Sequence, residues 1–263
     1  MPKRSRCVFT NVHNEHLFFP LWLRYYSQYF EPHDIYVIHL VRPVRFPFDD
    51  WMVQQNFRVI PILDRNYRHE QLIVNWVTSI QHELLADYHS VLYTDVDEFV
   101  WSSRGLGLFI DEYAGDVERC TGYEVVQSIE EEPDLDLSRP LLAQRKYWYY
   151  SPIYSKPLLA RIPLTYNVGF HDAVQSINRR ANPELLLIHL KKMDYKLALA
   201  RNLERQASEQ GSEAFKKRMT WGEPGYHAYL DHHNLEKWWY LSADTGQHAN
   251  FELIPDHVRA INI

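Results

Sequence analysis

The sequence predicts an α/β fold with a mostly parallel sheet. In its first hundred residues, apolar runs of strand length alternate with segments whose apolar residues recur at helical spacing. Such alternation is typical of strand–helix–strand units with right-handed crossovers. The length of 263 residues suits a single domain of this class. We therefore expect helices on both faces of the sheet and ligands beyond the carboxyl ends of its strands.

The first half of the chain carries the clearest periodicity. The expected strands are "CVFTNV" (7–12), "DIYVIHL" (34–40), "FRVIPIL" (57–63) and "SVLYTDVDEFV" (90–100). One expected helix carries Phe18, Leu21, Trp22, Tyr25 and Tyr29, and a longer one carries Leu72, Trp76, Val77, Ile80 and Leu84. A proline-broken loop separates the second and third strands.

The second half predicts a mixed or antiparallel extension. Its short strands are expected within 120–129, 144–151, 156–162 and 184–191, followed by helix from Asp194 to about Arg218. No repeat or linker interrupts the chain, so residues 1–263 are expected to form one domain. We expect a nucleotide-binding half (1–100), an acceptor and metal half (101–220) and a C-terminal segment (221–263) without an assigned role.

Composition excludes several classes of protein. The net charge of −6 argues against a nucleic-acid partner, which would need a basic surface. Cys7 and Cys120 cannot form a disulfide framework. No apolar run has membrane-spanning length, and no signal-peptide pattern follows "MPKRSR". We expect a cytoplasmic protein whose contact with a membrane, if any, is peripheral.

Two carboxylates lie toward the end of the fourth predicted strand, in "VLYTDVDEFV". On an extended chain Asp95 and Asp97 would share one face. At a separation of roughly 6 Å and an effective dielectric near 20, their repulsion is about 3 kcal/mol, which a divalent cation would reverse. The pattern favours a metal site over a solvated turn at the strand end.

Other motifs fail on their spacing. The fifth and sixth positions counted from Asp95 hold Phe99 and Val100, where a calcium loop needs an oxygen ligand and glycine. "HEQLI" and "HELLA" lack the second histidine of a zinc-protease helix, and "GLGLFI" lacks the last small residue of a dinucleotide fingerprint. The sequence has no phosphate-binding P-loop and no nucleophile elbow.

Four blocks in order resemble those of a known family. "TNVHNEHLFFPLWLRYYSQYF" and "YTDVDEFV", followed by "KPLLAR" with "GFHDA" and by "LLLIHLKKMDY", are similar to the family-2-like group of GT-A glycosyltransferases. The likeness covers roughly residues 7–201. It implies a GT-A-like fold, a nucleotide-diphosphate-sugar donor and an Asp-x-Asp metal motif.

The resemblance implies a metal centre. Asp97 would ligate Mn²⁺ or Mg²⁺, while Asp95 would contact ribose or share the metal through water. His189 would be a third ligand, and its imidazole favours Mn²⁺; otherwise it is an ordinary half-buried strand histidine. Lys191 and the adjacent Lys192 could meet the diphosphate.

Donor-binding residues are expected at the carboxyl ends of the first and third strands. The candidates are Asn11, Asn14, Glu15, Asp64, Arg68 and His69. Asp64 either bonds a uracil edge, which favours a UDP-sugar, or is an acid at a helix N-terminus. Arg68 and His69 either reach the diphosphate or occupy solvated helix positions.

The general base is the least defined part of the site. "GFHDA" offers Asp172, which we favour, and His171, which could instead orient the acceptor. The acidic run "IEEEPDLD" (129–136) is an alternative source of a base, although such runs are usually solvated loops. The aromatic residues of 147–154 either stack on an acceptor sugar or pack the strands.

These observations predict a metal-dependent glycosyltransferase, and the resemblance implies that it inverts. It would move a sugar from a nucleotide diphosphate to a saccharide or lipid-linked acceptor. The alternatives are a glycoside or nucleotide-sugar hydrolase and a catalytically inactive protein that binds a sugar or a partner on the same scaffold.

Overall fold

The computed structural model describes most of the chain, and the chain divides into two compact units. The described residues are 2–13, 15–41, 47–64, 69–128, 131–176, 180–198, 200–201 and 251–263, with only the backbone at 41 and 47–50. Unit 1 comprises Met1–Gly122 and Ser151–His189, and unit 2 comprises Tyr123–Tyr150 and Leu190–Ile263. Each unit is considered by itself.

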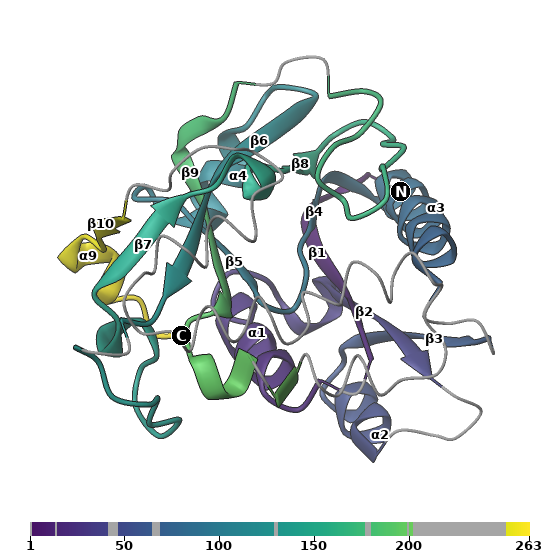
Figure 1. Ribbon diagram of the computed structural model, residues 1–263. Helices are drawn as coiled ribbons and strands as arrows, with labels where there is room; N and C mark the ends of the chain where they lie inside the picture. Colours follow the sequence, from purple (N-terminus) through teal and green to yellow (C-terminus); the bar gives the residue numbers. More distant parts are fainter. Residues whose placement is uncertain are drawn as a thin grey trace. The chain divides into compact units, whose positions relative to one another are not determined.

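Unit 1 is built on a central parallel sheet (Figure 1). Its parallel strands are β1 (Arg4–Val12), β2 (Ile35–Val41), β3 (Arg58–Leu63) and β4 (Tyr88–Tyr93), in the spatial order β4–β1–β2–β3. Val8 of β1 lies between Ile35 of β2 and Leu92 of β4. Two antiparallel strands follow beyond β4: β8 (Pro157–Ala160) and the first residues of β6 (Val117–Val126). The predicted α/β fold with a mostly parallel sheet is confirmed.

Helices pack against these strands. They are α1 (Phe18–Tyr26), α2 (Pro47–Gln54), α3 (Glu70–Asp87) and α4 (Leu106–Glu112), with the short 3-10 helices η1 (Pro32–Asp34) and η3 (Pro152–Tyr154). The expected helices correspond to α1 and α3, although Tyr29 lies beyond the end of α1. The sequence did not predict α2, which falls in the expected proline-broken loop, or α4, which is only two turns long.

The strand expected at 90–100 is interrupted. Strand β4 ends at Tyr93 and β5 (Glu98–Trp101) begins after a turn. The N–H of Glu98 donates to the carbonyl of Asp95 at 3.0 Å and closes this turn. Strand β5 pairs antiparallel with β9 (Asn182–Lys192), so Glu98 lies opposite His189. Asp95 and Asp97 therefore do not follow the alternation of an extended strand.

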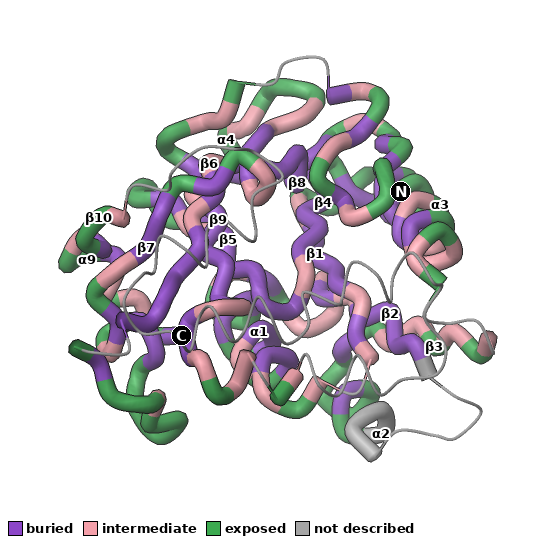
Figure 2. Tube along the Cα trace, viewed as in Figure 1, coloured by how far each residue is buried: buried purple, intermediate pink, exposed green. Residues whose placement is uncertain are grey.

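Aromatic side chains account for much of the buried core of unit 1. Strands β1 and β4 are mostly buried, as Figure 2 shows. Trp22, Tyr25 and Tyr26 of α1 are fully buried, and the indole Nε1 of Trp22 donates to Thr94 Oγ1 at 2.7 Å. Burying one large apolar side chain contributes about 1.5–3 kcal/mol. The packing of α1 thus also anchors the residue that precedes Asp95.

Unit 2 contains an antiparallel sheet. The last residues of β6 pair with β7 (Tyr147–Tyr150), and β10 (Phe251–Leu253) pairs with the other edge of β7. The short helices η2 (Leu142–Gln144) and α9 (Asp256–Arg259) complete its described elements. The predicted helix after Asp194 is present at 195–198, while its expected continuation beyond 201 lies outside the described residues. The helices that the structure describes, in both units, are too short or too polar to cross a membrane.

Candidate functional site

The candidate site lies in unit 1, at the carboxyl ends of β1 and β4. These two strands are parallel neighbours, so their carboxyl ends lie at the same edge of the sheet. Asn11 is near the end of β1, and the turn that carries Asp95 and Asp97 follows β4. The antiparallel partner of β5 brings His189 to the same place.

Both oxygens of Asp95 are engaged by neighbouring side chains. Its Oδ1 accepts hydrogen bonds from the Tyr93 hydroxyl at 2.8 Å and from Asn11 Nδ2 at 3.4 Å. Its Oδ2 lies 3.2 Å from the ammonium of Lys156. The side chain is still 32% exposed, so a ligand can reach it. The structure thus places Asn11 and Asp95, two predicted donor-binding residues, side by side.

Lys156 is a buried cation that the sequence analysis did not identify. Its side chain is 2% exposed, and its Nζ lies 2.5 Å from Oε1 of Glu98, which is fully buried. The other oxygen of Glu98 accepts the backbone N–H of Asp95 at 3.2 Å. Burial acts to lower the pKa of Lys156, but the charges of Glu98 and Asp95 outweigh it and raise that pKa. The only sequence signal was a lysine directly before the apolar run "PLLA".

Asp97 and His189 form a buried pair beside this network. The distance from His189 Nε2 to Asp97 Oδ1 is 3.7 Å, which is longer than a hydrogen bond. Two donor atoms that each lie about 2.1 Å from one metal ion are separated by about 3 to 4 Å. The pair therefore fits a shared divalent ion. Within the described residues no three His, Cys, Asp or Glu side chains converge as metal ligands, and Asp95 faces Lys156 instead.

Tyr154 orients His189. The two rings stack with centroids 3.9 Å apart and planes 27° from parallel. The backbone of Tyr154 lies so close to Gly122 that a Cβ there would be 2.2 Å from the carbonyl carbon of Tyr154. Only glycine allows this approach. The sequence analysis offered sugar stacking or strand packing for the aromatic residues of 147–154, and Tyr154 instead packs on a predicted metal ligand.

His171 lies at the end of a tight turn beside Tyr154. Gly169 and Phe170 both have positive φ, +83° and +59°, and for phenylalanine this conformation is uncommon. The Nδ1 of His171 must carry the proton, because it donates to the carbonyl of Ile153 at 2.9 Å. The residue as a whole is exposed, but neighbouring atoms shield its ring from water. This desolvation, together with the charge of Lys156, lowers the pKa of His171 to about 4. At neutral pH Nε2 therefore presents a lone pair.

Asp172, the base that the sequence analysis favoured, is held in an ion pair. Its Oδ1 lies 2.6 Å from a terminal nitrogen of Arg119 and also accepts the N–H of Ala173 at 3.0 Å. Arg119 is buried and donates as well to Ser155 and Ser176. The carboxylate thus contributes to holding the 165–176 segment against the β6–β8 region.

The remaining predicted donor-binding residues lie on other parts of the chain than Asn11 and Asp95. Glu15 accepts the N–H groups of Leu17 and Phe18 at 3.4 and 3.3 Å, at the start of α1. Half-buried Asp64 follows β3 directly, and exposed His69 precedes α3. Lys191 is half-buried on the part of β9 that belongs to unit 2. The other two candidates, Asn14 and Arg68, lie outside the described residues.

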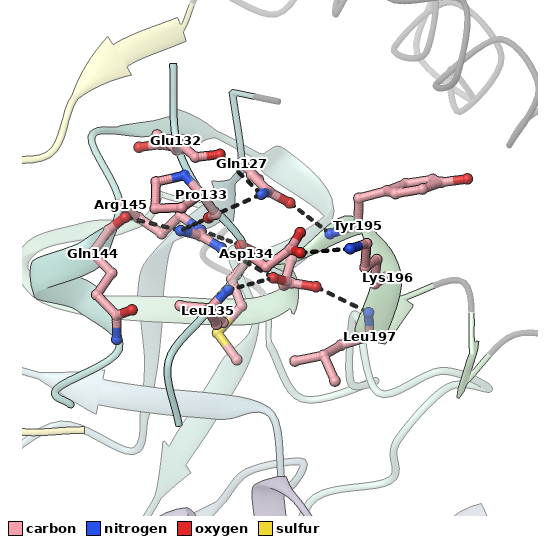
Figure 3. Close-up of polar contacts among 12 residues, drawn as sticks. Gln127, Glu132, Pro133, Asp134, Leu135, Gln144, Arg145, Tyr195, Lys196 and Leu197 are labelled. Atoms are coloured by element: carbon pink, nitrogen blue, oxygen red, sulfur yellow. Dashed lines mark hydrogen bonds and ion pairs between the residues drawn. The ribbon is translucent and has the colours of Figure 1, made fainter. Parts of the chain in front are cut away.

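The acidic run of unit 2 holds loops in place. Glu132 is buried and accepts the backbone N–H groups of Ser128 at 2.7 Å and Lys146 at 2.5 Å. Asp134 pairs with Lys196, and the neighbouring loop contacts Arg145 through the carbonyl of Pro133 (Figure 3). These contacts give Glu132 and Asp134 structural roles, which weakens their candidacy as the general base, while Glu130 lies outside the described residues.

Solved structures of known proteins are weakly similar to the chain. No family model and no curated protein matches the chain. Among solved structures the chain is similar to S. aureus TarS 1–349, at 12% identity and a TM-score of 0.36, covering 88% of this chain and 74% of the other. A structure of TarS 1–349 in complex with UDP-GlcNAc matches at 12% identity and a TM-score of 0.35, covering 90% and 79% of the two chains.

Proposed function

We propose that the protein is a glycosyltransferase that takes a sugar from a nucleotide diphosphate, with a UDP-sugar favoured, and transfers it with inversion to a saccharide or lipid-linked acceptor. The four ordered sequence blocks support this proposal. The observation that carries it is the pairing of Asp97 with His189, at 3.7 Å, beside Asp95 and Asn11 at the carboxyl ends of parallel strands. Ligands of open α/β sheets bind at such edges.

Asp97 and His189 are the residues that would hold Mn²⁺ or Mg²⁺. When bound, the ion would neutralise charge on the diphosphate as the sugar leaves. Asp95 and Asn11 would bind donor hydroxyls, because both are polar, accessible and held by Tyr93 and Lys156 in one orientation. We propose that Asp64, Glu15 and His69 lie toward the base and ribose. Asn14, Arg68 and Lys191 remain predicted donor contacts.

We propose that segment 171–172 accepts the proton of the acceptor hydroxyl. His171 suits this role better than Asp172, because its Nδ1–H bond to Ile153 leaves Nε2 as an acceptor whereas Asp172 is paired with Arg119. Asp172 would then position the turn. A neutral imidazole that accepts a proton acts as a general base.

A thermal-shift screen tests the function directly. The purified protein is heated with UDP, GDP, CDP or dTDP, each with Mn²⁺, Mg²⁺ or EDTA. A ligand that binds only the folded state stabilises it by about 2.7 kcal/mol at a hundredfold excess over its Kd. We expect UDP to raise the melting temperature with Mn²⁺ and to lose this effect in EDTA. No shift with any nucleotide would contradict the transferase and favour the hydrolase or the inactive binder.

Asp97→Asn tests the assigned ligand. The change removes a charged ligand but keeps the shape of the side chain, so we expect a folded protein without metal-dependent nucleotide binding. Asp87→Asn is the matched control, since Asp87 is exposed at the end of α3. Unchanged nucleotide affinity in Asp97→Asn would exclude Asp97 as a metal ligand.

A further inference from the structure

A buried lysine already supplies a positive charge between two carboxylates of the candidate site. Lys156 Nζ lies 2.5 Å from Glu98 and 3.2 Å from Asp95, and its side chain is 2% exposed. It also lies 5.8 Å from the ring centroid of Tyr154. An ammonium group this deeply buried needs compensating negative charge. Glu98 and Asp95 provide it.

The same geometry restricts what else Asp95 can bind. Its Oδ2 faces the ammonium, and its Oδ1 accepts two further hydrogen bonds, from Tyr93 and Asn11. A divalent ion on Asp95 would stand close to the charge of Lys156 and be repelled by it. Asp97 instead faces His189, at 3.7 Å, on the β5–β9 side.

We infer that Lys156 is the resident cation of Asp95 and Glu98 and keeps a divalent ion off Asp95. That the divalent ion binds to Asp97 and His189 instead is part of the proposed function, on which this inference rests. Asp95 is then a carboxylate held in place for donor hydroxyls, and Lys156 is a positioning residue. The two aspartates of the Asp-x-Asp motif would then have separate partners, Lys156 for Asp95 and, under the proposed function, a metal ion for Asp97.

The inference is tested by measuring Mn²⁺ binding with and without UDP, by electron paramagnetic resonance and calorimetry. The proteins compared are the wild type, Asp95→Asn, Asp97→Asn and Lys156→Met. We expect Asp95→Asn to change the Mn²⁺ affinity less than twofold, and Asp97→Asn to weaken it at least tenfold. Asp95→Asn weakening Mn²⁺ binding as much as Asp97→Asn does would overturn the inference.

Lys156→Met gives the sharper result, because it leaves two carboxylates without their cation. We expect this variant to gain a second Mn²⁺ ion or to bind Mn²⁺ at least tenfold more tightly than the wild type. Its melting temperature should also rise with Mn²⁺ more than that of the wild type. Lys146→Met is the control, because Lys146 is an exposed lysine of unit 2 paired with Glu131, and it should behave like the wild type.

The outcomes separate this inference from the proposed metal centre. If the wild type binds no Mn²⁺ and Lys156→Met gains an ion, the Asp97–His189 metal centre fails while the role of Lys156 stands. A folded Lys156→Met without any gain overturns that role. So does a Lys156→Met protein that stays unfolded when Mn²⁺ is added, since the ion should replace the lost charge.

Discussion

At the scale of single residues, the two aspartates of "YTDVDEFV" have different surroundings. Asp95 points into a hydrogen-bonded network with Asn11, Tyr93 and Lys156, whereas buried Asp97 faces His189. The two carboxylates, which the sequence does not distinguish, thus have different contacts in the structure. These different surroundings are the reason we propose hydroxyl binding for Asp95 and metal binding for Asp97.

The protonation of His171 is the first prediction at this scale. Its pKa is lowered from the usual 6.5 to about 4, so the folded state favours the neutral ring. The stability that this contributes is present above pH 6.5 and is lost as the pH falls toward about 4. NMR titration of the ring Cε1–H signal, assigned with His171→Gln, should give a midpoint well below 6.5. A midpoint at or above 6.5 would contradict the neutral Nε2 acceptor.

The choice of base is the second prediction. We expect His171→Gln to lower the rate of sugar transfer about 10²-fold or more, because a general base typically contributes that much. Nucleotide affinity should stay unchanged. Asp172→Asn should also keep nucleotide affinity and should reduce transfer less, since Asp172 acts through Arg119. A larger loss in Asp172→Asn than in His171→Gln, with nucleotide binding intact, would return the role to Asp172.

At the scale of elements, close packing between β6 and η3 shapes the site. The N–H of Gly122 donates to Ser155 Oγ at 3.1 Å, and its carbonyl accepts the N–H of Ser151 at 2.9 Å. These bonds enclose the segment that carries Tyr154, whose ring stacks on His189. Gly122 on β6 thereby helps to fix the position of the Tyr154 ring that packs on His189 of β9.

Gly122→Ala is the prediction at this scale. The new Cβ would meet the backbone of Tyr154, which cannot yield as a flexible side chain can. We expect a loss of about 1–3 kcal/mol in the free energy of unfolding, together with weaker Mn²⁺ and UDP binding. Urea unfolding and calorimetry would measure the two effects.

Gly107→Ala is the matched control in helix α4. Its Cβ would lie 2.9 Å from a terminal nitrogen of Arg6, and the end of a side chain can shift more readily than backbone. Alanine also favours the helix by about 0.5–1 kcal/mol. Equal destabilisation by the two substitutions would show that the approach of Gly122 to Tyr154 has no special importance.

At the scale of the whole molecule, each of the two compact units is formed by two separate segments of the chain. Unit 2 is assembled from two separate segments, 123–150 and 190–263. Arg145 joins them: it is fully buried, pairs with Asp194 at 3.2 Å and donates to the carbonyls of Met193 and Pro133. Asp194 in turn accepts the N–H of Leu197 at 3.0 Å at the start of the helical turn 195–198.

Arg145→Met tests this joint. The change leaves the buried carboxylate of Asp194 without its partner, and breaking a buried pair in this way costs about 3–5 kcal/mol. We expect a clearly lower urea midpoint. Lys146→Met removes an adjacent but exposed pair with Glu131 and should leave the midpoint unchanged. Similar effects of the two substitutions would exclude a special role for the buried network.

The sequence alone determined the α/β fold and predicted the region of the candidate site. Apolar periodicity predicts β1, β2, β3, α1 and α3, because strands and helices bury side chains at different spacings. The acids after a buried strand marked the sheet edge at Asp95 and Asp97. Both kinds of signal are local, so they can be read from neighbouring residues.

Only the tertiary structure decided the partners of those residues. The contact of Lys156 with Asp95 joins positions 61 residues apart in sequence, and the bond of Asn11 to Tyr93 joins positions 82 apart. The pairing of β5 with β9 likewise joins Glu98 to a strand from the second half of the chain. Periodicity reports which face of an element is buried but not what lies against it. Lys156 could therefore be identified as the partner of Asp95 only from the tertiary structure.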